Sequence, residues 1–131
     1  MEVKAAHTRL FVKDIGACAD FYRDVLQFEP ITIQVEKGYA EFQIADMRIS
    51  LFRQQEMSEI LRTSDRPANA NAQDNVALIL QVHNLDDIYH ELRKANVEFA
   101  EPPTKNVEFS LKVAYCRDPA GNLIGLFEAL M

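Results

Sequence analysis

In the stretch from Ala6 to Val12, the aliphatic Leu10 and Val12 alternate with Arg9 and Phe11, and this period of two predicts a strand. The period then changes to three and four, the spacing of an amphipathic helix, and Asp14 stands where a helix N-cap belongs. The apolar stripe of this helix consists of Ile15, Cys18, Ala19, Tyr22, Val25 and Leu26. Three more strands are predicted at Pro30 to Val35, Tyr39 to Ile44 and Met47 to Phe52. The turns between them are short, which favours an antiparallel meander.

The second half of the chain repeats this order of elements. A strand is predicted from Val76 to His83, with Asn84 as the N-cap of the next helix. The apolar stripe of that helix consists of Leu85, Ile88, Leu92 and Ala95. Further strands are predicted at Val97 to Ala100, before Pro102-Pro103 and a loop, and at Leu111 to Cys116 and Leu123 to Glu128. Each half therefore has the order strand, helix, strand, strand, strand.

An internal repeat explains why the two halves share this order. Leu10, Val12, Asp14 and Ile15 match Leu80, Val82, Asn84 and Leu85 at an offset of 70 residues. Ala45, Ile49, Leu51 and Phe52 match Ala120, Ile124, Leu126 and Phe127 at an offset of 75 residues. We expect one domain of two repeats, about 5–53 and 75–129, joined by a linker at 54–74. A turn or two of helix is expected around Met57, and Pro67 favours a surface connection.

Composition narrows the class of protein. The chain has 131 residues, of which 48% are hydrophobic and 26% charged, so it can bury a core. Its net charge of −6 argues against nucleic acid and anionic membranes as partners. No stretch of about 18 apolar residues is present and the N-terminal sequence lacks a signal peptide, so we expect a cytoplasmic protein. Cys18 and Cys116 are expected to be reduced and to serve mainly in packing.

Two segments carry a resemblance to a known family. The first is HTRLFVKDIGACADFYRDVLQFEP, at the start of the first repeat, and the second is YCRDPAGNLIGLFE, at the end of the second repeat. Together with the duplicated βαβββ order, they resemble the glyoxalase, bleomycin resistance protein and extradiol dioxygenase superfamily, also called vicinal oxygen chelate. The resemblance extends over nearly the whole chain, roughly Ala5 to Glu128.

The resemblance implies an α+β fold. Two βαβββ modules would form a curved, cleft-lining mixed sheet with helices outside, and a homodimer is expected. In the metalloenzymes of the family, a divalent ion in the cleft is held by His, Glu or Gln residues of the first and last strand of each module, where it acts as a Lewis acid.

The resemblance also places the four ligand positions in this sequence. They fall on His7, Ser50, Ala77 and Gly125, of which only His7 is a credible ligand. Exchange of modules within a dimer would redistribute these positions without adding ligands. A bulge or a slip of one residue could instead bring Glu41 or Glu128 into the cleft. His7 has three interpretations: a hydrogen-bonded histidine, a contact to an organic ligand, or a metal ligand.

Period-two alternation from these positions predicts the lining of the cleft. The predicted ligand-binding residues are His7, Arg9, Phe11, Arg48, Ser50, Phe52, Ala77, Ile79, Gln81, Tyr115, Gly125 and Phe127. The neighbours between them on the same strands are aliphatic and suit a face buried under the helices. Arg9 and Arg48 either pair with a carboxylate such as Glu41, which is slightly favoured, or bind an anionic group of a ligand.

We therefore predict a metal-independent small-molecule-binding protein that could sequester a drug or metabolite, with no cofactor and no catalytic residue. The alternatives are a lyase or dioxygenase that uses a divalent metal such as Zn, Ni, Mn or Fe on displaced ligands, and a non-catalytic interaction module. The sequence contains no Trp, so Tyr39, Tyr115 and the phenylalanines would have to stack on a flat ligand. At the helix ends, Asn96 tolerates a left-handed conformation, whereas Gln27 does so poorly and favours a different turn.

Overall fold

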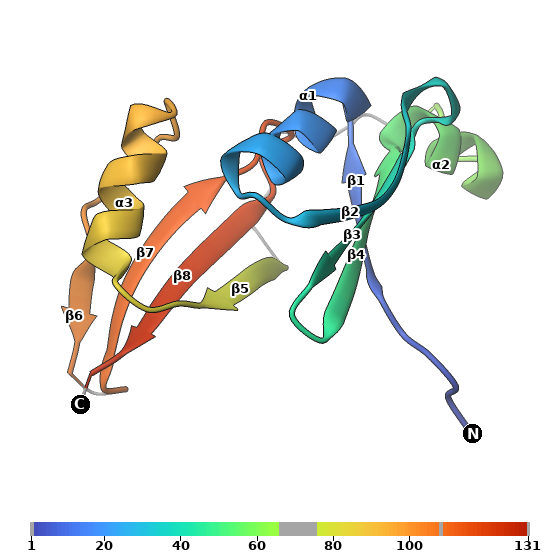
Figure 1. Cartoon of the computed structure of the whole chain (residues 1–131). Helices are drawn as coiled ribbons and strands as arrows, with labels where there is room; N and C mark the ends of the chain where they lie inside the picture. Colours follow the sequence, from blue (N-terminus) through green and yellow to red (C-terminus); the bar gives the residue numbers. More distant parts are fainter. Residues whose placement is uncertain (1, 66–75, 108, 131) are drawn as a thin grey trace. The chain divides into compact units, whose positions relative to one another are not determined.

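The computed structural model describes residues 2–65, 76–107 and 109–130, and the chain divides into two compact units, Met1–Asn71 and Ala72–Met131 (Figure 1). Unit 1 contains β1 (Thr8–Val12), α1 (Ile15–Asp20), a π-helical turn (Phe21–Val25), β2 (Glu29–Gln34), a 3-10 turn (Val35–Lys37), β3 (Tyr39–Ile44), β4 (Met47–Arg53) and α2 (Gln54–Leu61). Unit 2 contains β5 (Ala77–Gln81), α3 (Leu85–Lys94), β6 (Thr104–Asn106), β7 (Leu111–Arg117) and β8 (Leu123–Ala129). The predicted α+β class is confirmed.

Each unit has a four-stranded mixed sheet of the same topology. The strand orders are β1-β4-β3-β2 and β5-β8-β7-β6, with the first pair of each sheet parallel and the others antiparallel. Leu10 pairs with Leu51 in unit 1, and Leu80 pairs with Leu126 in unit 2. These pairs are related by the offsets of 70 and 75 residues that the sequence shows. The internal repeat is therefore a repeat of strand register.

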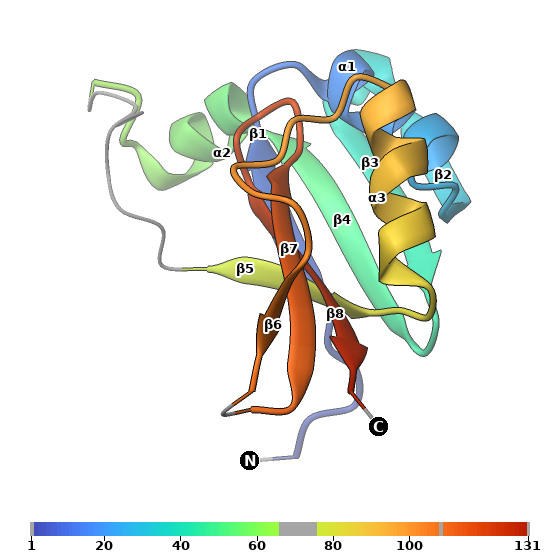
Figure 2. The ribbon, with the colours of Figure 1, turned by 90° about the vertical axis from the view of Figure 1, so that its left-hand side faces the viewer.

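One face of each sheet is buried under its helix (Figures 1 and 2). In unit 1 the buried residues of this layer are Leu10, Val12, Ala40, Phe42, Ile49 and Leu51 from the sheet and Ile15, Cys18, Ala19 and Tyr22 from the helical segment. In unit 2 they are Leu78, Ala114, Cys116, Ile124 and Leu126 from the sheet and Leu85, Tyr89 and Leu92 from α3. Because side chains alternate along a strand, this packing turns the other face of each sheet away from its helix. We call that second face the open face.

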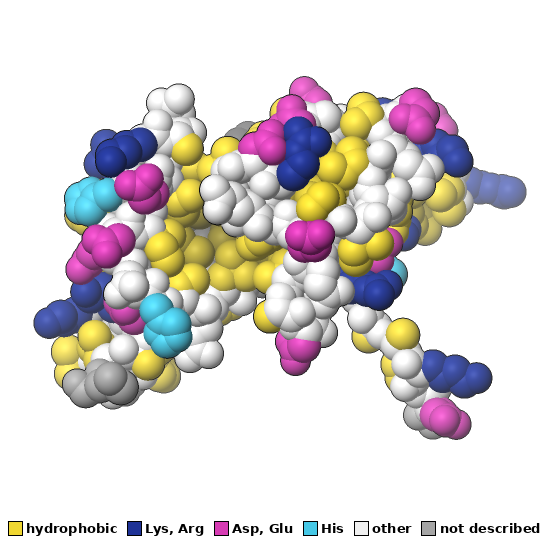
Figure 3. Space-filling model, in the orientation of Figure 1, with side chains coloured by type: hydrophobic (Ala, Val, Ile, Leu, Met, Phe, Trp, Pro, Cys, Tyr) yellow, Lys and Arg dark blue, Asp and Glu magenta, His cyan; other side chains and the backbone are white. Residues whose placement is uncertain are grey.

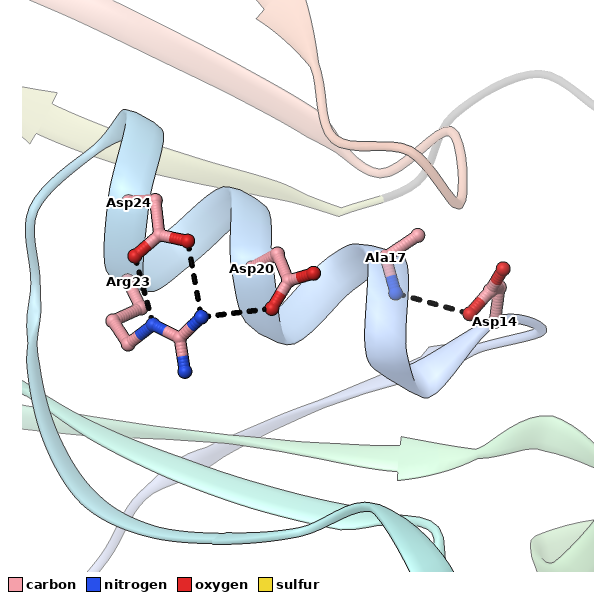
Figure 4. A network of polar contacts seen from close by, with 5 residues as sticks. All are labelled: Asp14, Ala17, Asp20, Arg23 and Asp24. Carbon is pink, nitrogen blue, oxygen red and sulfur yellow. Dashed lines mark hydrogen bonds and ion pairs between the residues drawn. The ribbon is translucent and has the colours of Figure 1, made fainter.

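The first helix begins as predicted but does not stay α-helical. The carboxylate of Asp14 accepts a hydrogen bond from Ala17 N at 3.0 Å, and Arg23 pairs with Asp20 and Asp24 on the outer surface (Figure 4). From Phe21 the helix widens into the π-helical turn. It ends at Gln27, whose φ of 60° is left-handed, so the prediction that Gln27 avoids this conformation is wrong. The hydrogen bond from Phe28 N to Tyr22 O, at 2.9 Å, fixes the chain reversal there.

Helix α3 has a different cap from the predicted one. Asn84 precedes the helix but makes no capping hydrogen bond through its side chain. The carboxylate of Glu128, on β8, accepts hydrogen bonds from Asn84 N at 2.7 Å and Leu85 N at 3.4 Å. Acidic side chains in the first turn and basic ones in the last complement the helix dipole, and the charges on the outer face of α3 are visible in Figure 3.

The edge strand of unit 2 is displaced from the predicted position. Val97 to Ala100 contributes only the isolated bridge between Phe99 and Cys116 rather than a strand. Regular pairing begins at β6, which opposes Thr104 to Val113, in a stretch predicted as loop. Pro102 and Pro103 explain the shift, because neither has an N–H to donate to the ladder.

The segment between the repeats includes α2, which agrees with the expected turn or two of helix. Pro67, with the rest of 66–74 in the predicted linker, lies outside the described residues. None of the helices in the described part of the chain is long and apolar enough to cross a membrane.

The left-handed Gln27 gives a stability test. Gln27→Gly should raise the free energy of unfolding by about 0.5–1 kcal/mol, because glycine adopts this conformation without the steric cost of a Cβ. Asn96→Gly is the matched control, since Asn96 has a φ of 67° but is a residue type that tolerates it. Urea denaturation of the parent protein and the two variants measures the change in the free energy of unfolding that each substitution causes. A lower stability of Gln27→Gly than of the parent would contradict this account.

Candidate functional site

The open face of unit 1 carries a row of three polar side chains. Strand pairing puts Arg9, Ser50 and Glu41 side by side on β1, β4 and β3. Ser50 is completely buried, whereas the strand positions beside it are occupied by two long charged side chains. The row therefore combines a buried hydroxyl with an acidic and a basic side chain on the face turned away from α1.

Arg9 is held over this face by contacts with three residues, Ser50, Phe52 and Tyr39. Its Nε donates a hydrogen bond to Ser50 Oγ at 3.2 Å. The guanidinium carbon lies 5.0 Å from the ring centre of Phe52 and 5.8 Å from that of Tyr39, within the range of cation–π attraction. The two rings themselves meet edge to face, with centres 6.4 Å apart. The guanidinium is thus held over the rings of Phe52 and Tyr39.

Glu41 is engaged by other partners. Tyr39 donates its hydroxyl to Glu41 Oε2 at 2.9 Å, and Arg48 Nη1 lies 3.6 Å from Glu41 Oε1. The pKa of the Tyr39 hydroxyl is raised, first by burial and then by the hydrogen bond to Glu41, and the nearby Arg9 opposes this shift only in part. Tyr39 therefore remains a neutral hydrogen-bond donor at neutral pH. The pairing predicted for the two arginines applies to Arg48.

A pocket of about 460 Å³ lies within unit 1, between the end of the sheet and α2. Phe11, on the open face of β1, forms part of its wall, so the pocket continues the surface that carries Arg9. Its lining is Phe11, Lys13, Arg53, Gln54, Gln55, Met57, Ser58, Leu61, Thr63 and Ser64. The sequence pattern placed Phe11 in the site but did not predict that α2 lines it. The apolar residues Met57 and Leu61, in a mostly polar helix, were the signal that could have indicated this.

The corresponding row in unit 2 is apolar. Strand pairing aligns Ile79, Gly125 and Tyr115 on β5, β8 and β7, at the places that Arg9, Ser50 and Glu41 occupy in unit 1. A Cβ on Gly125 would lie 2.7 Å from Ile79 Cδ1 and 3.0 Å from Tyr115 Cε1 and Phe127 Cε1. Neighbouring apolar side chains therefore fill the space that a longer residue at Gly125 would need. Tyr115 and Phe127 meet edge to face, with ring centres 5.9 Å apart.

A second pocket, of about 480 Å³, lies beside the edge of this sheet. Its lining is Ala100, Glu101, Pro102, Thr104, Lys105, Asn106, Val107, Val113, Ala114 and Tyr115. Only Tyr115 of this set was predicted, because the sequence predicts a loop in the stretch that includes β6. Pro102, at the interruption of the edge strand, is part of this lining.

The four family ligand positions do not form a donor set. His7 lies one residue before β1, which starts at Thr8 rather than at the predicted Ala6. Residues 2–7 are all exposed, so no burial holds this part against β4. Ala77 is exposed and, like Gly125, has no side-chain donor atom. In the described residues there is no group of three His, Cys, Asp or Glu side chains placed to hold a metal ion. The residues at these positions do not fit the divalent ion of the family's metalloenzymes.

The two carboxylates that a slip or bulge could have supplied are used elsewhere. Glu41 bonds to Tyr39 and faces Arg48, with no slip in the pairing of β3 and β4. Glu128 caps α3. The remaining candidate for chemistry, Cys116, is buried, which raises the pKa of its thiol to about 11, with a smaller effect from Asp118. A thiol with this pKa is a poor nucleophile at neutral pH.

The structure thus sorts the predicted site residues into two open faces. Arg9, Phe11, Arg48, Ser50 and Phe52 are in unit 1, with His7 just outside its sheet. Ala77, Ile79, Gln81, Tyr115, Gly125 and Phe127 are in unit 2. Tyr39 and Glu41 complete the polar row of unit 1.

Comparison with protein-family models identifies the family, and relatives and solved structures match the chain over nearly its whole length. Residues 4–126 match the model of the Glyoxalase/Bleomycin resistance protein/Dioxygenase superfamily. The uncharacterized protein YraH of Bacillus subtilis is 30% identical over 128 residues, which cover 98% of this chain and 100% of YraH. A glyoxalase/bleomycin resistance protein/dioxygenase from Nocardioides superposes with a TM-score of 0.77 at 21% identity, covering 99% of this chain and 87% of that one.

A lactoylglutathione lyase from Agrobacterium tumefaciens superposes with a TM-score of 0.70 at 20% identity, covering 98% of this chain and 96% of the lyase. At this identity the likeness concerns the fold alone. The match of the family model over almost the whole chain is the stronger finding. The chain belongs to the glyoxalase/bleomycin resistance protein/dioxygenase superfamily.

Proposed function

We propose that the protein is a metal-independent small-molecule-binding member of the superfamily, a cytoplasmic homodimer that sequesters a drug or metabolite on the open faces of its sheets. The acidic composition and two buried cysteines fit a cytoplasmic protein, and the family resemblance supports a dimer. The proposal assigns no catalytic residue. Binding without a metal ion is supported by the family ligand positions and by the lining of the open faces.

The observation that carries the proposal is the packing of side chains around Gly125. A metal ligand at this position would need a side chain that projects from the open face of β8. Ile79, Tyr115 and Phe127 close over the glycine instead, within 2.7 to 3.0 Å of where a Cβ would be. The position therefore contributes to an apolar surface and supports binding of an organic group rather than an ion.

The equivalent position in unit 1 supports the same function. Ser50 is buried and its hydroxyl accepts the hydrogen bond from Arg9 Nε. A positive charge so close to the position disfavours a divalent cation there. The residue types at both positions thus favour a ligand other than a metal ion.

The lining has the character of a small-molecule surface. Large apolar side chains remain exposed on the open faces, including Phe11 at 44%, Ile79 at 47% and Tyr115 at 41%. Isolated polar groups stand among them, and pockets of about 460 and 480 Å³ adjoin the two faces. Mostly apolar walls with a few fixed polar groups are typical of sites for small organic ligands.

A ligand-type residue introduced at Gly125 tests the apolar packing. Gly125→Glu should lower the free energy of unfolding by about 1–3 kcal/mol, because three neighbouring side chains must move. Ala77→Glu is the matched control, since it adds the same residue to the same face at an exposed position and should change stability by less than about 0.5 kcal/mol. Thermal and urea denaturation compare the two. Equal tolerance of both substitutions would contradict the packing described for Gly125.

Binding itself is tested by a thermal-shift screen carried out in EDTA. A library of aromatic, apolar, anionic and cationic compounds should contain ligands that raise the Tm by several degrees at saturation, as expected when a ligand binds only the folded state. Isothermal titration should confirm one-to-one binding of such a ligand in the same buffer. If no compound bound in EDTA and binding appeared on adding a divalent metal, the alternative of a lyase or dioxygenase with displaced ligands would replace this proposal.

A further inference from the structure

We propose that the ligand is an apolar monocarboxylate, that its carboxylate binds the guanidinium of Arg9, and that its apolar part lies along Phe11 toward the pocket beside α2. This inference rests on the proposed small-molecule-binding function and assigns the chemical class of the ligand. It uses only residues of unit 1.

The first argument is the difference between two arginines on the same open face. Arg48 faces a carboxylate, with Nη1 3.6 Å from Glu41 Oε1, and also donates to Gln43 Oε1 at 3.3 Å. Arg9 forms no ion pair with any carboxylate in the described part of the chain. Arg48 is therefore a paired surface arginine, whereas Arg9 keeps its charge available to an anion.

The second argument is that Arg9 is already ordered for binding. Its Nε is held by Ser50 Oγ, and its guanidinium lies over Phe52 and Tyr39. The Nη groups at the far end of the guanidinium are the donors that a carboxylate would use, and such charge-assisted pairs are the strong ones. An arginine fixed in advance loses less side-chain entropy on binding than one free in solvent.

Charges around Arg9 restrict the kind of anion. Glu41 lies in the same row, two strands from Arg9, and its negative charge is held there by Tyr39 and Arg48. The Tyr39 hydroxyl, whose pKa is raised by burial and by Glu41, is neutral at physiological pH and adds no charge. Arg9, Arg48 and Glu41 together carry a net charge of +1, which a singly charged carboxylate would neutralise and a phosphate dianion would exceed.

The apolar part of the ligand is inferred from the surface beyond Arg9 along β1. Phe11 is two residues further on the same face, about 7 Å away along the strand, and is 44% exposed. Phe11 also forms part of the wall of the 460 Å³ pocket, where Met57 and Leu61 add apolar surface. An anionic head on Arg9 and an apolar body reaching this pocket would occupy one continuous surface.

Matched acids and amides test this assignment. We would measure, by isothermal titration in EDTA, the binding of benzoate, phenylacetate, 2-naphthoate and octanoate beside their primary amides. At least one acid should bind ten-fold or more tightly than its amide, because only the acid forms the charge-assisted pair. Arg9→Gln should remove this preference, and Arg9→Lys should weaken it because lysine lacks the planar fork.

Arg93→Gln is the matched control. Arg93 also lies over a tyrosine, 5.7 Å from the ring of Tyr89 and bonded to its hydroxyl, but on the exposed surface of α3 in unit 2. Its substitution should leave the affinity for the acid unchanged. Circular dichroism and the Tm without ligand show whether each variant is folded.

The outcomes separate the two proposals. Amides that bind as tightly as the acids, with affinities that Arg9→Gln leaves unchanged, would overturn the carboxylate assignment and leave the small-molecule-binding function in place. Failure of all the acids, in a protein that binds other compounds of the thermal-shift library, would also overturn only the assignment. Failure of the acids together with the whole library would reject both.

Discussion

The parallel pairing of the first and last strand in each module determines which side chains meet on the open faces. It puts Arg9 beside Ser50 in unit 1 and Ile79 beside Gly125 in unit 2. Because a slip of one residue would exchange the two faces of a strand, the burial of the aliphatic positions under the helices fixes this register. The hydrogen bond between Arg9 and Ser50 depends on that register.

The two modules use the same register for different surfaces. In unit 1 the row across the sheet consists of Arg9, Ser50 and Glu41, and the guanidinium of Arg9 lies over aromatic rings. In unit 2 the equivalent row is an isoleucine, a glycine and a tyrosine, and their side chains close over the glycine. The open face of unit 1 therefore carries charged side chains, whereas the equivalent row of unit 2 is apolar. The two rows occupy corresponding strands, so the difference between the rows lies in their side chains.

Much of the fold could be predicted from local patterns. The strands of the meander in unit 1 alternate clearly and are separated by short turns, so β3 begins and ends where the sequence predicts and β4 extends one residue further, to Arg53. The features that were missed depend on contacts between distant residues or on details of the backbone. The cap of α3 comes from Glu128, 44 residues away from Asn84, and no local signal indicates it.

The candidate site was predictable in its residue types but not in its pairings. Alternation placed Arg9 and Arg48 on the face away from the helices, yet both could have paired with Glu41. Only the pairing of β3 with β4 and the side-chain conformations show that Arg48 faces Glu41 while Arg9 bonds to Ser50. The left-handed Gln27 was missed for a related reason, since the tertiary packing of the first helix outweighs the preference of one residue.

The central claim, that this member of the superfamily works without a metal ion, is tested most directly by its metal content. The protein, purified without chelator, should contain less than about 0.1 equivalents of Zn, Ni, Mn or Fe by elemental analysis, because its ligand positions offer too few donors. Adding each metal in turn should leave the Tm unchanged. About one equivalent of tightly bound metal per chain, with a higher Tm on loading, would contradict the account.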